Sequence, residues 1–167
     1  MAPPPDDTPE SLDGEFACVA FSPDGKTLAT GGKDGYVRFF SFPAGKRLGP
    51  QAVSKVAISS LALGPNRRVA TVDVQGVVRI FSHLETSVGA FGPWPIGFEF
   101  TPRLEIGAAS IAFKNDGALH AVTADGTIVQ IDAKTGMEMR RIPGRDGKRT
   151  KTVRAFPNLV VQILDDG

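Results

Sequence analysis

Cysteine is nearly absent from this chain, which has one, Cys18, among its 167 residues. A single thiol cannot form an intramolecular disulfide, so the class of small secreted proteins stapled by disulfides is excluded. Cys18 falls within an apolar segment that has the composition of a core strand. We therefore interpret it as a small buried hydrophobic residue and not as a reactive thiol.

The sequence also lacks a charge excess and long apolar runs. Its 19 basic and 18 acidic side chains leave a net charge of +1, which gives no general attraction to nucleic acid or to a membrane surface. No stretch approaches the ~20 apolar residues that a membrane helix needs. The N-terminus carries neither the basic cap nor the apolar segment of a secretory signal. We therefore expect a soluble, cytoplasmic protein with no nucleic-acid and no membrane partner.

Groups that carry catalysis or bind metals are scarce. The two histidines, His83 and His120, lie in different repeats, and together with Cys18 they cannot supply a closed zinc site. No nucleophile elbow joins serine, histidine and aspartate, and the Gly31-Gly32 pair lacks the pattern of a phosphate-binding loop. The aspartates beside turn-forming residues are explained by turn geometry. We expect no enzymatic activity, no catalytic residue, no metal and no cofactor.

What the chain does contain is an internal repeat. Equivalent apolar residues stand at Phe21, Leu63, Phe113 and Phe156, each before a turn sequence, and they are 42, 50 and 43 residues apart. The repeat is clear three times and partial the fourth time. A period of roughly 40–45 residues with short strands and turn signals is typical of a propeller blade.

The first repeat shows how such a unit forms four strands. Its hydrophobic runs are too short for helices and rich in Val, Phe and Thr. Ser22-Pro-Asp-Gly25 and Asp34-Gly35 are turn sequences between these runs. The expected strands cover residues 16–21, 27–30, 36–41 and 46–48. We therefore predict an all-β protein, a β-propeller of four-stranded antiparallel blades with about three complete blades and part of a fourth.

The repeats also predict the domain organisation. Residues 1–13 are rich in Pro and Asp, so we expect a disordered tail there that offers no outer strand to the first blade. The partial propeller then occupies residues 14–167, with repeats at about 16–55, 56–107, 108–150 and, truncated, 151–167. Such a propeller leaves two apolar blade faces uncovered. We expect the chain to be the amino-terminal part of a longer product or to complete its ring by self-association.

Several motifs of the first repeat carry a family resemblance. They are Phe21-Ser-Pro-Asp-Gly25, Leu28-Ala-Thr-Gly-Gly32, the Asp34-Gly35 hairpin and Tyr36-Val-Arg-Phe-Phe-Ser41. These residues resemble the repeats of the WD40 β-propellers, and the resemblance extends over roughly residues 16–164. It implies a propeller that serves as a non-enzymatic scaffold for protein binding.

The chain departs from the WD40 pattern at known positions. The family's Trp-Asp pair and its Gly-His pair are missing from every repeat. In the family, that histidine and the hairpin aspartate belong to a hydrogen-bonded network that stiffens the blade. Asp34 and Asp125 match the hairpin aspartate, whereas Gln75 stands at its place in the second repeat. The resemblance therefore implies a network that is at best partial.

Two further resemblances leave alternatives open. The segment from Asp125 through Lys134-Thr-Gly136 to Met139 resembles a repeat of the quinoprotein (PQQ-type) propellers, which implies a ligand-binding or enzymatic role completed by blades outside this chain. The segment from Leu28 to Pro43 is similar to the Sec12-type exchange-factor propellers. Its residues are mostly the general repeat consensus.

Two segments depart from the repeat. An insertion near residues 87–107 lengthens the second spacing and contains Trp94, the chain's only tryptophan, together with Arg103. Residues 140–151 carry six basic side chains, Arg149 among them. Trp94 either anchors a partner or caps the adjacent blades. The basic segment either binds an acidic group or is a solvated connection between repeats.

The sequence therefore predicts an interaction scaffold and not an enzyme. We expect an unidentified protein partner to bind one face of the propeller, which consists of the connections between blades and the Asp-Gly hairpins. The candidate partner-binding residues on that face are Lys33, Trp94, Arg103 and Arg149.

Overall fold

The chain folds into short strands in every part that the structure describes. The computed structural model describes residues 15–82, 103–114, 116–144, 150–156 and 159–164. One turn of 3-10 helix, η1 (Pro65–Arg67), accompanies the strands in these residues. The strands are β1 (Phe16–Phe21), β2 (Thr27–Gly32), β3 (Tyr36–Ser41), β4 (Arg47–Ala52), β5 (Ile58–Leu63), β6 (Arg68–Asp73), β7 (Val77–Ser82), β8 (Leu104–Glu105), β9 (Ala108–Phe113), β10 (Leu119–Thr123), β11 (Ile128–Ile131), β12 (Glu138–Ile142), β13 (Thr150–Phe156) and β14 (Leu159–Leu164).

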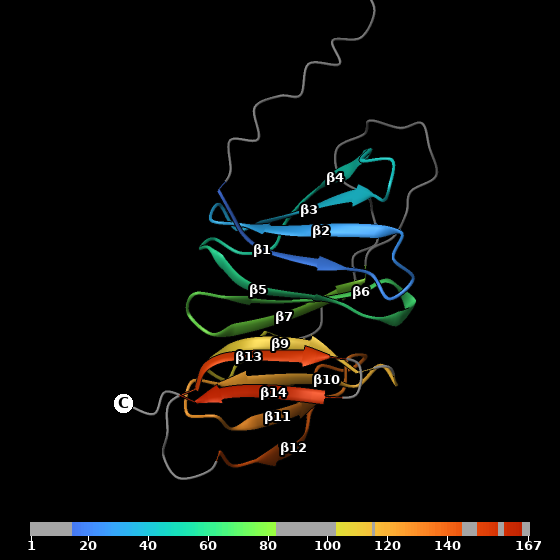
Figure 1. Cartoon of the computed structure of the whole chain (residues 1–167). Helices are drawn as coiled ribbons and strands as arrows, with labels where there is room; N and C mark the ends of the chain where they lie inside the picture. The colour runs from blue at the N-terminus through green and yellow to red at the C-terminus, as the bar shows by residue number, and fades with distance from the viewer. Residues whose placement is uncertain (1–14, 83–102, 115, 145–149, 157–158, 165–167) are drawn as a thin grey trace, which may run out of the picture.

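Antiparallel sheets of four strands form the repeating unit. Blade 1 has the order β1-β2-β3-β4, blade 2 the order β5-β6-β7-β8 and blade 3 the order β9-β10-β11-β12, while β13 and β14 pair as a two-stranded sheet. The sheets lie one upon the next (Figure 1), and contacts join β1 to β5, β5 to β9 and β9 to β13. The prediction of an all-β propeller with about three complete blades and part of a fourth is confirmed.

The strands of blade 1 lie close to where the turn chemistry places them. β1 and β3 have the predicted bounds, and β2 extends two residues further, to Gly32. The outer strand β4 is longer than expected and pairs with β3 from Tyr36↔Ala52 to Phe40↔Arg47. The strand predicted at residues 46–48 is therefore confirmed in longer form and gives blade 1 its outer strand, whereas the tail of residues 1–13 lies outside the described residues.

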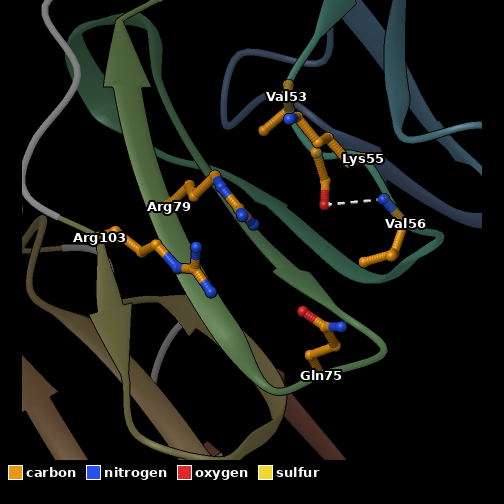
Figure 2. Close-up of a pocket in the computed structure, with 7 residues that line it drawn as sticks. Val53, Lys55, Val56, Gln75, Arg79 and Arg103 are labelled. Atoms are coloured by element: carbon orange, nitrogen blue, oxygen red, sulfur yellow. Dashed lines mark hydrogen bonds between the residues drawn. The ribbon is translucent and has the colours of Figure 1, made fainter.

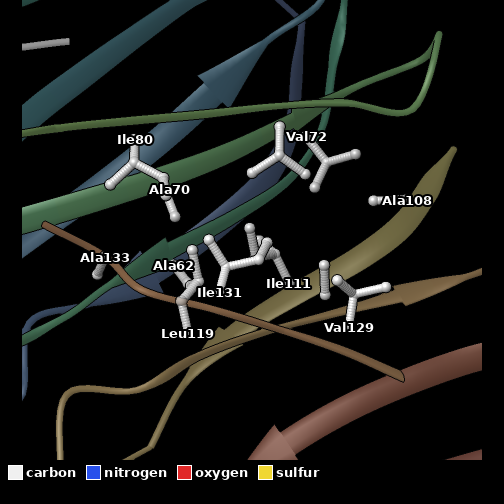
Figure 3. Packing of buried hydrophobic residues seen from close by; sticks show 12 residues of the cluster. Ala62, Ala70, Val72, Ile80, Ala108, Ile111, Leu119, Val129, Ile131 and Ala133 are labelled. Atoms are coloured by element: carbon white, nitrogen blue, oxygen red, sulfur yellow. The ribbon is translucent and has the colours of Figure 1, made fainter. Parts of the chain in front are cut away.

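Apolar side chains fill the space between the blades. Phe39 of blade 1 packs with Ile58 and Phe81 of blade 2 in a buried cluster. A second cluster joins blades 2 and 3, where Ile80 packs with Ile131 and its neighbours (Figure 3). Along β7, alternate residues point to opposite faces of the sheet. Blade 2 is therefore buried on both faces and blade 1 on one.

The opposite face of blade 1 is apolar and exposed. Val19 and Phe21 of β1 are 62% and 51% exposed, and the ring of Phe42 meets that of Phe21 edge-on at 5.2 Å. An apolar depression of about 260 Å³ on this face is lined by residues that include Phe16, Leu28, Thr30, Phe40 and Phe42. We call this surface the open face of blade 1.

Cys18 and His120 occupy structural positions within strands. The Cys18 Sγ lies 3.9 Å from the carbonyl oxygen of Ile58, and burial raises the pKa of the thiol. His120 pairs with Ala112 and Gln130 across blade 3, and burial lowers the pKa of its imidazole. His83 lies outside the described residues. Burial thus favours the neutral form of both side chains.

Candidate functional site

Hairpins and inter-blade connections meet at one end of the blades. The carbonyl oxygen of Gly35, in the β2–β3 hairpin, accepts hydrogen bonds from the backbone N–H groups of Val53 and Ser54 at 3.0 and 3.1 Å. In blade 2, the carbonyl oxygen of Gly76 accepts one from Ala108 at 3.0 Å. We call this end of the blades the hairpin face. It is built of backbone segments that hold one another in place.

Glycine is required where the hairpin touches the connection. Gly35 has a φ of +81°, and a Cβ there would lie 2.1 Å from the carbonyl oxygen of Ser54. Gly76 has a φ of +77°, and a Cβ would lie 2.7 Å from the Cα of Gly107. Both the left-handed conformation and the close approach favour glycine. The glycine that Asp34-Gly35 and Gln75-Gly76 share therefore reflects contact between a hairpin and the following connection.

An open depression of about 530 Å³ lies on the hairpin face between blades 1 and 2. Its lining comes from three segments: the β4–β5 connection, the start of β7 with its hairpin, and the residue before β8 (Figure 2). We call it the inter-blade pocket. Its polar lining residues are Ser54, Lys55, Gln75, Arg79 and Arg103, and the seven lining residues include three cations and no acid.

A buried carboxylate lies behind this pocket. The Asp73 side chain is 1% exposed, and its Oδ2 lies 2.6 Å from Nη1 of Arg79 and accepts the Ser54 hydroxyl at 3.1 Å. Its Oδ1 accepts the backbone N–H groups of Gln75 and Val77 at 3.0 and 3.1 Å. Asp73 thereby links the β4–β5 connection, the β6–β7 hairpin and β7.

Opposing effects act on the pKa of Asp73. Burial disfavours its charged form, but the Arg79 guanidinium, the backbone N–H donors and the Ser54 hydroxyl outweigh that penalty. The result is a pKa held below the usual range of an aspartate. Asp73 is therefore ionised at neutral pH and keeps Arg79 in a fixed position.

In blade 1, the third-strand arginine is bonded to a carboxylate from a different position. Asp34 lies in the hairpin itself, and its two oxygens accept a bidentate pair of bonds from Arg38, at 3.2 Å for Nη1 and 2.6 Å for Nη2. Arg38 and Arg79 share one position in the repeat, as do Gly32 and Asp73. A Cβ at Gly32 would lie 2.3 Å from Oδ1 of Asp34. The carboxylate thus comes from the hairpin in blade 1 and from the end of the second strand in blade 2.

Gln75 does not leave the second hairpin without a carboxylate, although the family's histidine stays missing from the network. The second repeat lacks the hairpin aspartate, yet Asp73 makes equivalent bonds to the hairpin backbone and to the third-strand arginine. In blade 3, Asp125 keeps the hairpin position and accepts the backbone N–H of Thr127 at 3.1 Å. The described hairpin of each four-stranded blade thus has its own carboxylate.

The structure describes two of the four site residues predicted from the sequence. Lys33 lies in the β2–β3 hairpin, is exposed and forms an ion pair with Glu15. Arg103 lines the inter-blade pocket and lies 3.0 Å from the carboxylate of Glu105. Both belong to the hairpin face. Trp94 and Arg149 lie outside the described residues.

Sequence reasoning missed Lys55, Asp73 and Arg79. One signal was available, since an arginine stands at the same position in the third strand of repeats one and two. Nothing in the sequence links Arg79 to Arg103. The two residues are neighbours across the antiparallel strands because the residues beside them, Val78 and Leu104, are paired.

Neither a metal centre nor a membrane-spanning helix is found in the described residues. Within them, no three His, Cys, Asp or Glu side chains are grouped as a metal ion requires. Nor do they form a helix long and apolar enough to cross a bilayer. The expected lack of enzymatic activity stays a prediction.

Comparison with known proteins agrees with the repeat and the fold. Residues 11–41 match the family model described as WD domain, G-beta repeat. Comparison of the sequence with curated proteins gives no match.

Two solved structures illustrate the shared fold. The chain is similar to the β-propeller domain of Cps50 (Swd1) from Myceliophteria thermophila, with a TM-score of 0.69 and 15% identity over 90% of this chain and 50% of that chain. It is also similar to hydrazine synthase from Kuenenia stuttgartiensis, with a TM-score of 0.72 and 19% identity over 99% of this chain and 46% of that one. The chain thus spans about half the length of each. The repeat, the blade architecture and the structural neighbours show that the chain is a β-propeller, and its first repeat matches the WD40 family.

Proposed function

We propose that the protein is a non-enzymatic scaffold that binds protein partners on its hairpin face. The observation that carries this proposal is the inter-blade pocket, a cationic depression whose walls are fixed by backbone hydrogen bonds and by the Asp73–Arg79 pair. A rigid surface loses little conformational entropy when a partner binds. Lys33, Trp94, Arg103 and Arg149 remain the candidate partner-binding residues of this proposal, and the cytoplasm remains its proposed location.

The alternative functions suggested by the sequence differ in kind from a scaffold. A quinoprotein-type fragment would bind a ligand or take part in an enzyme, and hydrazine synthase shows that an enzyme can contain a similar fold. A likeness of 19% identity concerns the fold alone. The scaffold is favoured because the pocket lining includes three cations, Lys55, Arg79 and Arg103, which suit recognition of an anionic partner.

A charge reversal on the hairpin face tests the proposal. Replacing Arg103 by glutamate, together with Lys55→Glu, should remove the protein partners that the wild-type chain retains in affinity purification from its source cells. Quantitative mass spectrometry measures the loss. The matched control is Lys46→Glu, because Lys46 is an exposed lysine in the β3–β4 turn at the opposite end of the blade. Equal recovery of every partner by the double variant would contradict binding at the hairpin face.

We also propose that the open face of blade 1 packs against a second copy of the chain. Apolar residues cover the corresponding faces between blades 1 and 2 and between blades 2 and 3, whereas Val19 and Phe21 lie exposed. Burial of apolar surface contributes about 25 cal/mol for each Å² removed from water. Two copies would supply about the number of strands that a closed ring of four to eight blades requires.

Polar substitution on that face should abolish the association. Val19→Asp is expected to convert a dimer into a monomer, because it places a charge in an apolar interface. Light scattering coupled to size-exclusion chromatography measures the mass. Val74→Asp is the control, since Val74 lies in the β6–β7 hairpin and is as exposed as Val19, at 62%. A stable, non-aggregating wild-type monomer at micromolar concentration would contradict the proposal.

A further inference from the structure

The inter-blade pocket contains an arginine whose position is set before any ligand arrives. Nη1 of Arg79 is bonded to the buried carboxylate of Asp73 at 2.6 Å, and only 17% of the Arg79 side chain is exposed. A guanidinium has five N–H donors, so this bond leaves donors on Nη2 and Nε. The guanidinium lies at the pocket wall (Figure 2). The entropy cost of ordering this side chain is therefore largely met in the folded state.

Two further cations surround the pocket and are easily redirected. Arg103 points toward the same space as Arg79 (Figure 2) and is 54% exposed. Its ion pair with Glu105 joins two exposed side chains, and such surface pairs contribute little to stability. Lys55 is exposed on the β4–β5 connection. An incoming anion can thus recruit Arg103 and Lys55 without breaking a strong interaction.

The remaining lining groups suit a peptide. The Gln75 side chain points toward the pocket from the hairpin (Figure 2), and its amide both donates and accepts hydrogen bonds, as a peptide backbone requires. Val53 and Val56 supply apolar wall. That wall suits the methylene groups of a glutamate side chain. No aromatic side chain belongs to the lining, so a nucleic-acid base would find no stacking partner among these residues.

We propose that the inter-blade pocket binds a carboxylate side chain of an acidic peptide segment in a protein partner. The guanidinium groups of Arg79 and Arg103 donate to the carboxylate, Lys55 adds a flanking positive charge, and the Gln75 amide bonds to the backbone of the peptide. Planar guanidinium groups match the geometry of a carboxylate. This inference rests on the proposed scaffold function and names the chemistry of the partner.

Fluorescence anisotropy with a defined probe tests the inference. The probe is a short fluorescein-labelled peptide of alternating glycine and glutamate, and the comparison peptide has glutamine in place of every glutamate. We expect the glutamate peptide to bind the wild-type chain at least about tenfold more tightly, because hydrogen bonds to a charged carboxylate are stronger than those to a neutral amide. Raising the salt concentration should weaken this binding.

Variants assign the binding to the pocket. Arg103→Glu and Lys55→Glu should each weaken binding of the glutamate peptide about tenfold, since each replaces an attraction by a repulsion. Lys46→Glu makes the same charge change at the far end of the blade and should leave the affinity unchanged. Circular dichroism melting curves check that the variants remain folded.

The outcomes separate this inference from the scaffold proposal. Equal binding of both peptides, or equal affinity of the Arg103 and Lys46 variants, would overturn the acidic-peptide site. So would tighter binding of a labelled single-stranded oligonucleotide that the Arg103 variant loses, because the pocket would then recognise phosphate. If the acidic site fails while hairpin-face variants still lose cellular partners, the scaffold stands and its partner has a different chemistry.

Discussion

Replacing Asp73 by alanine should destabilise the fold by about 3 kcal/mol, because removal of one partner of a buried ion pair leaves the other charge uncompensated. The carboxylate is 1% exposed and bonds to Arg79, to the Ser54 hydroxyl and to the backbone N–H groups of Gln75 and Val77. Its loss leaves all four donors without their acceptor. Urea denaturation followed by circular dichroism measures the change in the free energy of unfolding.

Asp34 provides the matched control for this experiment. It forms the equivalent ion pair with Arg38 in blade 1, but its side chain is 31% exposed. Water can therefore replace part of what Asp34→Ala removes, and we expect a loss of about 1 kcal/mol. An Asp34 variant as damaged as the Asp73 variant would contradict the role of burial in this argument.

The effect of Asp73→Ala should also depend on pH. The folded state lowers the pKa of Asp73, so the stability that its charge contributes is fully present above the unfolded value of about 3.9. That contribution disappears as the pH falls through the folded pKa. The difference between wild type and variant should therefore be constant from neutral pH to about pH 5 and shrink below about pH 4. A difference that grows toward low pH would contradict the assignment.

In blade 1, the carboxylate can be moved from residue 34 to residue 32, which corresponds to Asp73 of blade 2. We expect strong coupling between substitutions at these two positions. Gly32→Asp alone is expected to destabilise the chain by about 2 kcal/mol, since a Cβ at residue 32 would displace the Asp34 carboxylate and two like charges would meet. Adding Asp34→Gln should recover most of the loss. The double variant then has the Asp-x-Gln-Gly arrangement of blade 2, with Arg38 available to the new carboxylate.

A double-mutant cycle quantifies this coupling. We expect an interaction energy of about 2–3 kcal/mol from urea denaturation of the two single variants and the double variant. Gly32 does not have a left-handed φ, so a side chain there meets no backbone strain. Additive effects of the two substitutions would mean that Arg38 does not bond to the new carboxylate at residue 32. They would contradict the equivalence of the two carboxylate positions.

The strands and their grouping into blades could be predicted from the sequence alone. The turn sequence from Ser22 to Gly25 and the Asp34-Gly35 hairpin mark the ends of short apolar runs, and the bounds of β1 and β3 follow from them. The 42-, 50- and 43-residue spacings predicted how many blades the chain contains. These features are local, because turn chemistry and alternation act within a few residues.

The carboxylate in each hairpin required the tertiary structure. The repeat pattern placed Gln75 where an aspartate was expected, and so predicted an incomplete network. Asp73 fills the role because alternate residues of β6 point to the same face as alternate residues of β7, which brings it to Arg79. The motif position in the hairpin does not reveal a carboxylate that comes from the end of the preceding strand.

The inter-blade pocket likewise could not be predicted from the sequence. Its cations come from the β4–β5 connection, from β7 and from the residue before β8, segments that are far apart in the sequence. Packing of blade 1 on blade 2 places Lys55 and Arg79 in the lining of one pocket, and the pairing of β7 with β8 adds Arg103 to it. Spacing along the chain contains none of this information, because a pocket between blades depends on how two sheets pack and on which residues their strands pair.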